Sequence, residues 1–187
     1  MTLARTILNK LKLNENDDDD YDYDDNNIIE KRINDAYDTK ELDLSGLGLR
    51  ELPKGIYYIS HLQSLDISGN ALNFIPQRFK EFKFLKVLNA SDNYIEELPD
   101  SFFELKNLIE LNLANNKIDK LSPKIEKLEK LEQLFLDGNR MSELPFELVE
   151  LTKLKHFSYD EDLIEEEDFP QPLRDIRGIY INDVKQS

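Results

Sequence analysis

The chain has no cysteine, no tryptophan and only two histidines among its 187 residues. Without cysteine it can form no disulfide bond, no thiolate metal site and no cysteine nucleophile. The sequence also contains no phosphate-binding glycine loop, dinucleotide-binding fingerprint, metalloprotease helix or nucleophile elbow. We therefore expect no catalytic site, no cofactor and no metal, and a protein that is not an enzyme.

Positive charge is also scarce. Lys and Arg number 24 against 39 Asp and Glu, which gives a formal net charge of -15. An acidic chain is repelled by nucleic-acid phosphates and by anionic membrane surfaces, so nucleic acid is not an expected ligand. A basic segment of another protein fits this charge balance better.

Long hydrophobic runs are missing as well. Near the N-terminus, Asn9 and Lys10 interrupt the apolar residues, and no stretch of the chain is long enough to cross a bilayer. We expect no membrane insertion, no cleavable signal peptide and a cytoplasmic location. A transit peptide or membrane-surface helix at the N-terminus, and export by another route, remain open alternatives.

What the chain does contain is a repeat. Rows of 23 residues align without gaps, and each opens with L-x-x-[L/F]-x-[L/I/A/Y]. The alternation of apolar residues at positions four and six predicts a short strand with one buried face. A single row would leave its apolar side chains exposed to water, so the rows must stack into a parallel sheet. The rows begin at Thr39, Leu62, Leu85, Leu108, Leu131 and Leu154.

Two further positions of the row are predicted to be structural. Asn at position nine suits a sharp turn, where its amide can bind backbone groups of the neighbouring coil. Proline at position fifteen can start a short helical or 3₁₀ return segment. The departures are Leu47 for Asn in the first row and Ser122 for Pro in the fourth. Position nine is otherwise Asn70, Asn93, Asn116 and Asn139, and position fifteen is otherwise Pro53, Pro76, Pro99 and Pro145.

Both ends of such a stack need covers. Between residues 28 and 37 the apolar side chains Ile29, Ile33, Ala36 and Tyr37 share one helical face. After Tyr159 the repeat stops and an acidic stretch leads to an apolar tail. The predicted organisation is an N-terminal helix and disordered acidic linker (1–27), a capping helix (28–38), the repeats (39–159) and an irregular acidic C-terminal cap (160–187).

These rows resemble the leucine-rich repeat family, in particular its 23-residue L-P-x-x-I/F/L class, which includes Ras-suppressor-like, plant intracellular Ras-group-related and bacterial proteins. The resemblance implies an α/β fold, a right-handed leucine-rich-repeat solenoid with a curved parallel sheet on its concave face. It also implies a protein-interaction module that binds a partner protein. A bacterial effector that binds a host protein is the alternative.

The outward positions three, five and seven line the concave face. None of these eighteen positions is Lys or Arg, whereas lysine is frequent on the convex side and in loops. Phe135 is an isolated aromatic among polar residues, which indicates an apolar anchor for a partner with a basic or polar contact segment. In the alternative interpretation, Phe135 packs against Val87, Ala114 or the cap, and the acidic charge only maintains solubility. We predict a monomer whose binding residues are Asp43, Asp66, Asn89, Glu110, Asn112, Phe135, Asp137, His156 and Asp160.

Two sequence patterns resemble functional sites, one a catalytic triad and the other a calcium-binding loop. His156, Ser158 and Asp160 alternate along one strand face, but such residues lie roughly 6.6 Å apart, too far for a hydrogen-bonded triad. The aspartate run around residues 17–25 has calcium-loop spacing, but Asp25 and Lys31 occupy positions that need Gly and Glu. His61 is interpreted as an ordinary loop residue.

Overall fold

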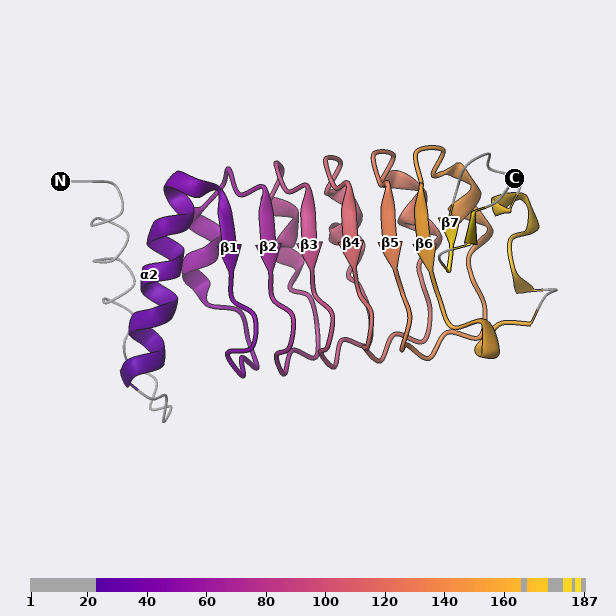
Figure 1. Cartoon of the computed structure of the whole chain (residues 1–187). Coiled ribbons are helices and arrows are strands. Elements are labelled where there is room, and N and C mark those ends of the chain that lie inside the picture. Colours follow the sequence, from indigo (N-terminus) through magenta and orange to yellow (C-terminus); the bar gives the residue numbers. More distant parts are fainter. Residues whose placement is uncertain (1–22, 166–167, 175–179, 183, 186–187) are drawn as a thin grey trace.

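The computed structural model describes residues 23–165, 168–174, 180–182 and 184–185. Within these ranges the chain forms a solenoid in which an open curved sheet lies on one side and short 3₁₀ helices lie on the other (Figure 1). The sheet has the order β1 to β8, following the sequence. Its strands are β1 (Glu41–Asp43), β2 (Ser64–Asp66), β3 (Val87–Asn89), β4 (Glu110–Asn112), β5 (Gln133–Phe135), β6 (His156–Ser158), β7 (Tyr180–Ile181) and β8 (Val184–Lys185).

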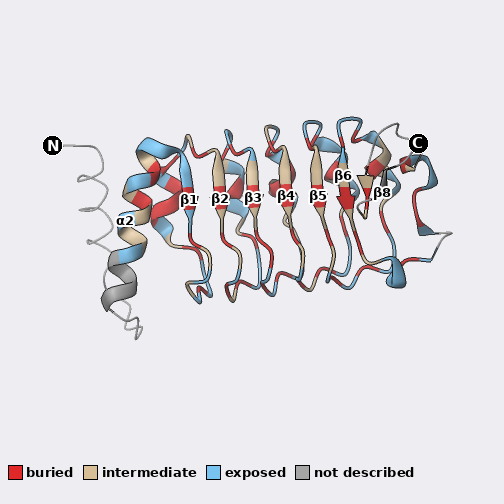
Figure 2. Cartoon of the chain, viewed as in Figure 1, coloured by how far each residue is buried: buried red, intermediate tan, exposed pale blue. Residues whose placement is uncertain are grey.

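The predicted repeat length of 23 residues determines the pairing register of the first six strands. Strands β1 to β6 pair in parallel, each residue with the one 23 positions later, for example Leu88 with Leu111. The central residue of each of these strands is buried and its two neighbours are not. Figure 2 shows the buried residues along the interior, between the sheet and the 3₁₀ helices. Stacking therefore buries the apolar stripe, as the pattern requires.

A 3₁₀ helix follows each of the first five strands. Proline, in an extended or nearly extended conformation, precedes the first, second, third and fifth of these helices. Ser122 precedes the fourth. The Ser122 hydroxyl accepts a hydrogen bond from the Lys124 N–H at 3.3 Å, so it caps the fourth helix, in which proline is the first helical residue (Pro123). The helices are η1 (Lys54–Tyr58), η2 (Gln77–Glu81), η3 (Asp100–Glu104), η4 (Pro123–Lys127) and η5 (Phe146–Glu150).

The position-nine asparagines form a buried ladder that ties each coil to the previous one. Asn93 accepts a hydrogen bond from the Leu72 N–H at 3.0 Å. Its amide donates to the carbonyl oxygens of Ile67 at 2.9 Å and Ser91 at 3.0 Å. Asn70, Asn116 and Asn139 repeat these bonds in their own coils. The predicted structural role of asparagine is confirmed.

The N-terminal cap is helix α2 (Tyr23–Thr39), which packs beside β1. Ile33 and Ala36 are buried against the first repeat, and the Tyr37 hydroxyl donates to the Tyr58 carbonyl at 2.7 Å. The helix starts five residues before the predicted boundary at residue 28, so residues 23–27 are not part of a linker. The rest of the predicted N-terminal helix and linker, residues 1–22, lies outside the described residues.

The C-terminal region extends the sheet. The irregular stretch after β6 contains η6 (Glu161–Leu163) and η8 (Gln171–Leu173), and β7 then pairs in parallel with β6. Strand β8 pairs antiparallel with β7. The prediction of an irregular cap was therefore incomplete. Tyr180 lies 24 positions after His156, its partner in the register, so the 23-residue pattern could not reveal this strand.

Candidate protein-binding face

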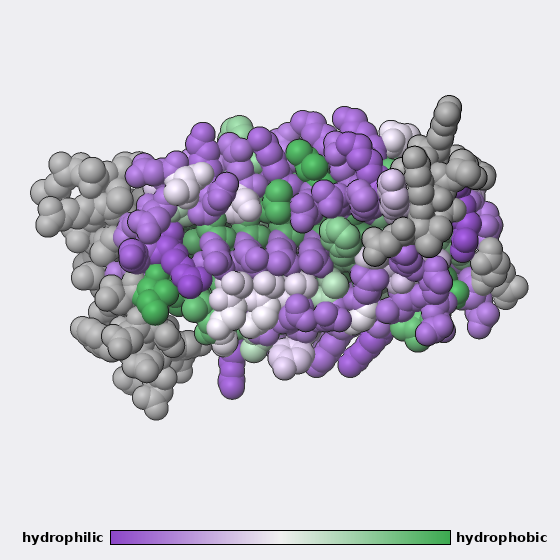
Figure 3. All heavy atoms as spheres, in the orientation of Figure 1, coloured by the Kyte–Doolittle hydropathy of each residue, from purple (hydrophilic) through white to green (hydrophobic). Residues whose placement is uncertain are grey.

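The concave face consists of strand positions three, five and seven of the six repeats. All nine predicted binding residues lie on it, since every one occurs in β1 to β6 or within two residues of the strand end. Each is at least partly exposed, in alternation with the buried central residues. Figure 3, viewed onto the sheet, shows hydrophilic side chains in a band across the strands. The structure thus places the predicted residues on one continuous surface.

Position-five side chains fold back onto their own chain. Asp43, Asp66, Asn89 and Asn112 each accept a hydrogen bond from the N–H two residues later, at 2.8 to 3.2 Å. The Ser45 hydroxyl and N–H, with a weaker contribution from Arg32, lower the pKa of Asp43 below its usual value. Asp43 therefore stays charged while it closes the turn. These side chains have a structural role that the sequence analysis did not assign to them.

Hydrogen bonds also join neighbouring repeats across the face. Asn89 donates from Nδ2 to Oδ2 of Asp66 at 3.0 Å, and the Ser158 hydroxyl donates to Asp137. Asp160 accepts from the Asn139 N–H at 3.1 Å. The carboxylates at these points are held in place before any partner binds, which reduces the entropy lost on binding.

Phe135 interrupts the turn pattern. It occupies position five of the fifth repeat, where the first four repeats carry Asp or Asn. Its ring has no acceptor for the Asp137 N–H, so this turn lacks the bond that Asn112 makes to Ala114. Phe135 is partly exposed and does not belong to the buried core. A residue that breaks a local structural rule without joining the core is a candidate for function.

The charge of the face has one sign. Its acidic residues are Glu41, Asp43, Asp66, Glu110, Asp137 and Asp160, and Lys and Arg are absent from its eighteen positions. The Arg32 guanidinium of α2 reaches only the edge, where its Nη1 lies 3.5 Å from a carboxylate oxygen of Asp43. Lysines instead occur just before the strands, where Lys155 pairs with Glu132 at 2.6 Å. This arrangement favours a partner segment with positive charge.

Aromatic residues gather at the C-terminal end of the face. The His156 ring stacks on Tyr180 with 5.1 Å between centroids and 13° between planes. Tyr180 comes from β7 and was missed by the sequence analysis, because it lies outside the repeat period. The face therefore differs along its length: carboxylates dominate β1 and β2, and rings dominate β5 to β7.

The three residues that imitate a triad have separate partners. His156 stacks on Tyr180, Ser158 donates to Asp137, and Asp160 accepts from Asn139. His61 binds the Tyr37 carbonyl oxygen through Nε2 at 2.8 Å and so attaches the capping helix. No group of three or more His, Cys, Asp or Glu that could hold a metal occurs in the described parts of the chain. The described helices include none with the length and apolarity needed to cross a membrane.

Comparison with protein families identifies the repeats. Leucine-rich repeat models match residues 61–82 and 83–141. A solved leucine-rich repeat protein of Leptospira interrogans superposes with a TM-score of 0.60 and 25% sequence identity, over 80% of this chain and 49% of that chain. Comparison with curated protein sequences gave no match. The chain is a leucine-rich repeat protein, and it spans about half the length of that structural relative. Its assignment to the 23-residue class stays a prediction.

Proposed function

We propose that the protein is an interaction module that binds a partner protein through its concave face, as a monomer in the cytoplasm. Leucine-rich repeat domains generally mediate protein–protein interaction, which supports the first part. The choice of the concave face rests on one observation. Phe135, which breaks the turn pattern, is surrounded there by carboxylate and amide side chains. A partner with a basic or polar segment fits this chemistry.

The experiment is an affinity capture from the native lysate with the full chain, followed by affinity measurements on the captured protein. Phe135→Ala should weaken binding by about 1–3 kcal/mol, because it removes an aromatic anchor. Phe84→Ala is the matched control, since Phe84 is an exposed phenylalanine outside the strands. Affinity should be unchanged by this control.

Charge reversal tests the contribution of the acidic residues on the concave face. Asp66→Lys together with Glu110→Lys should chiefly slow association, and binding to the wild-type chain should weaken as salt rises, with screening over roughly 8 Å at physiological ionic strength. Unchanged affinity in every concave variant would refute the proposal. An effector that binds a host protein would use the same surface, and the identity of the captured protein would distinguish it.

A further inference from the structure

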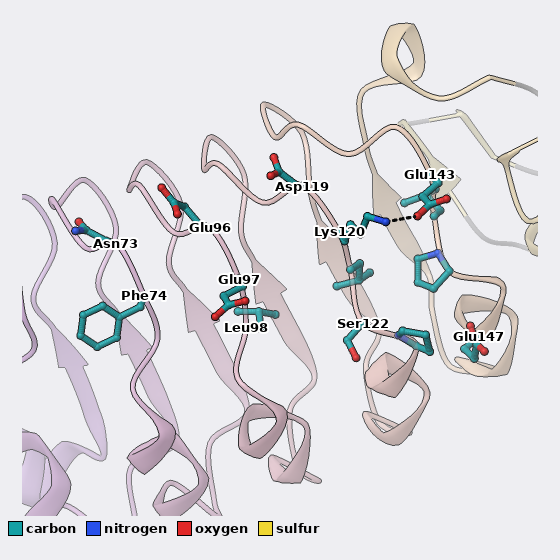
Figure 4. Close-up of a pocket in the computed structure, with 14 residues that line it drawn as sticks. Asn73, Phe74, Glu96, Glu97, Leu98, Asp119, Lys120, Ser122, Glu143 and Glu147 are labelled. Carbon is teal, nitrogen blue, oxygen red and sulfur yellow. Dashed lines mark ion pairs between the residues drawn. The ribbon is translucent and has the colours of Figure 1, made fainter.

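A second surface lies on one flank of the solenoid, where each chain segment leads from the strand edge to the 3₁₀ helix. Four consecutive repeats form there a hollow of about 1100 Å³, here called the flank groove. Figure 4 shows its side chains, which come from equivalent segments of neighbouring coils. Its lining includes Phe74, Glu96, Glu97, Leu98, Asp119 and Glu147.

Phe74 is the repeat-breaking residue of this groove. At position thirteen the other four repeats carry Glu51, Glu97, Lys120 and Glu143. The Phe74 side chain is 49% exposed, so the fold does not need it for the core. Leu98, one repeat further, is partly buried, whereas its equivalents Leu121 and Leu144 are buried. Together they supply an accessible apolar contact where the repeat otherwise presents charge.

The charges of the groove determine which occupant fits. Glu96, Glu97, Asp119 and Glu147 form no ion pair with any described residue. Lys120 is paired with Glu143 at 3.2 Å (Figure 4). Nearby cations are also engaged, since Lys124 pairs with Asp100 and Lys117 lies over the Tyr94 ring at 4.6 Å. The groove thus has a surplus of negative charge around its apolar contact.

We propose that the flank groove is a second docking surface, whose occupant is an extended segment of a partner protein with an apolar side chain between Lys or Arg residues. The apolar side chain contacts Phe74 and Leu98, and the cations face Glu96, Glu97 and Glu147. Four coils spaced roughly 4.8 Å apart span about 15 Å, the length of five extended residues. This surface is separate from the concave face and does not depend on it.

The test is a nuclear magnetic resonance titration of the isotope-labelled full chain at low salt. The probe is a capped synthetic peptide, Arg-Lys-Leu-Phe-Lys-Arg, and the control peptide has Ser in place of Leu and Phe. The first peptide should shift the backbone resonances of Leu98 and Ser122, and the control should bind about tenfold more weakly. Shifts confined to the concave strands, equal binding of both peptides, or no binding would overturn the proposal.

Variants locate the contact. Phe74→Lys should abolish the groove shifts, because it removes the apolar contact and repels the cationic peptide, and it should keep the stability, because Lys120 already occupies this position in another repeat. Glu96→Lys with Glu97→Lys should weaken binding about tenfold through the charges alone. Phe135→Ala, on the concave face, should leave the groove shifts unchanged. Self-association of the chain that disappears in Phe74→Lys would identify a second copy as the occupant and would also overturn the proposal.

Discussion

The buried asparagine ladder and the outer position five carry related side chains but follow different rules. At position nine, Asn70, Asn93, Asn116 and Asn139 make the same bonds in every coil. At position five, Asp or Asn gives way to Phe135 and Ser158 toward the C-terminal end. An inner substitution leaves buried backbone groups without a partner, whereas at an outer position water can replace the lost bond. The residue at position five can therefore differ between repeats, for example to bind a partner, with little loss of stability.

The comparison is sharpest between Asn93 and Asn89, which lie four residues apart. Asn93→Ala should destabilise the protein by about 2–5 kcal/mol, because the buried Leu72 N–H loses its acceptor and the carbonyls of Ile67 and Ser91 each lose a hydrogen bond. Asn89→Ala is the matched control and should cost less, about 1 kcal/mol, since Asn89 is partly exposed and accepts from a single backbone N–H, that of Ser91. Denaturant unfolding of both variants measures the difference. Equal losses would contradict the distinction between the ladder and the face.

Gly69 and Gly138, both at position eight of their repeats, allow a second test. It compares how much stability an alanine costs at equivalent turns with different surroundings. Gly69 and Gly138 both have left-handed backbone, with φ of 64° and 69°. A Cβ at Gly138 would lie 2.2 Å from Asn115 Oδ1 and 3.0 Å from its Cα, whereas Gly69 has no atom closer than 3.7 Å. Gly138→Ala should therefore destabilise by about 2–4 kcal/mol and Gly69→Ala by about 1–2 kcal/mol. Thermal unfolding that ranks them in the opposite order would show that the crowding is relieved.

Tyr57 is an exception to the rule that buried polar groups are paired. Its hydroxyl is buried and has no hydrogen-bond partner among the described residues, and burial raises its pKa to about 12. Tyr57→Phe keeps the stacking on Phe82 and should be neutral or stabilise by up to about 1 kcal/mol.

The pH dependence of this variant has a definite sign. A raised folded pKa means that the contribution of Tyr57 is complete below pH 10 and decreases between pH 10 and 12, since the unfolded chain releases the proton first. The unfolding free energy of Tyr57→Phe should lose that part of the alkaline slope. An identical slope in wild type and variant would refute the assignment.

The smallest expected effect tests whether Phe135 serves binding at the expense of the turn. Phe135→Asn should restore the bond to the Asp137 N–H and stabilise the protein by about 0.5 kcal/mol, while partner binding weakens. Phe135→Ala, which cannot make this bond, is the control for loss of the ring. Unfolding and affinity measurements on both variants separate the two effects. A destabilised Phe135→Asn with normal binding would show that Phe135 is structural.

The sequence by itself determined the repeat step, the buried stripe, the asparagine turns and the face on which the predicted residues lie. These features follow from local periodicity, because each coil packs only on its neighbours and every repeat must satisfy the same backbone groups. Leu111 and Asn93 could be placed from the pattern alone, and the structure confirms both.

The tertiary structure decided what periodicity does not encode. Strand β7 joins the sheet at a spacing of 24, because after Tyr159 the chain follows an irregular path of its own before it returns to pair with β6. The turn bond of Asp66 and the exposure of Phe74 likewise depend on which atoms the folded coils bring together. Such contacts depend on the orientation of individual side chains, whereas the 23-residue pattern specifies only which positions are apolar.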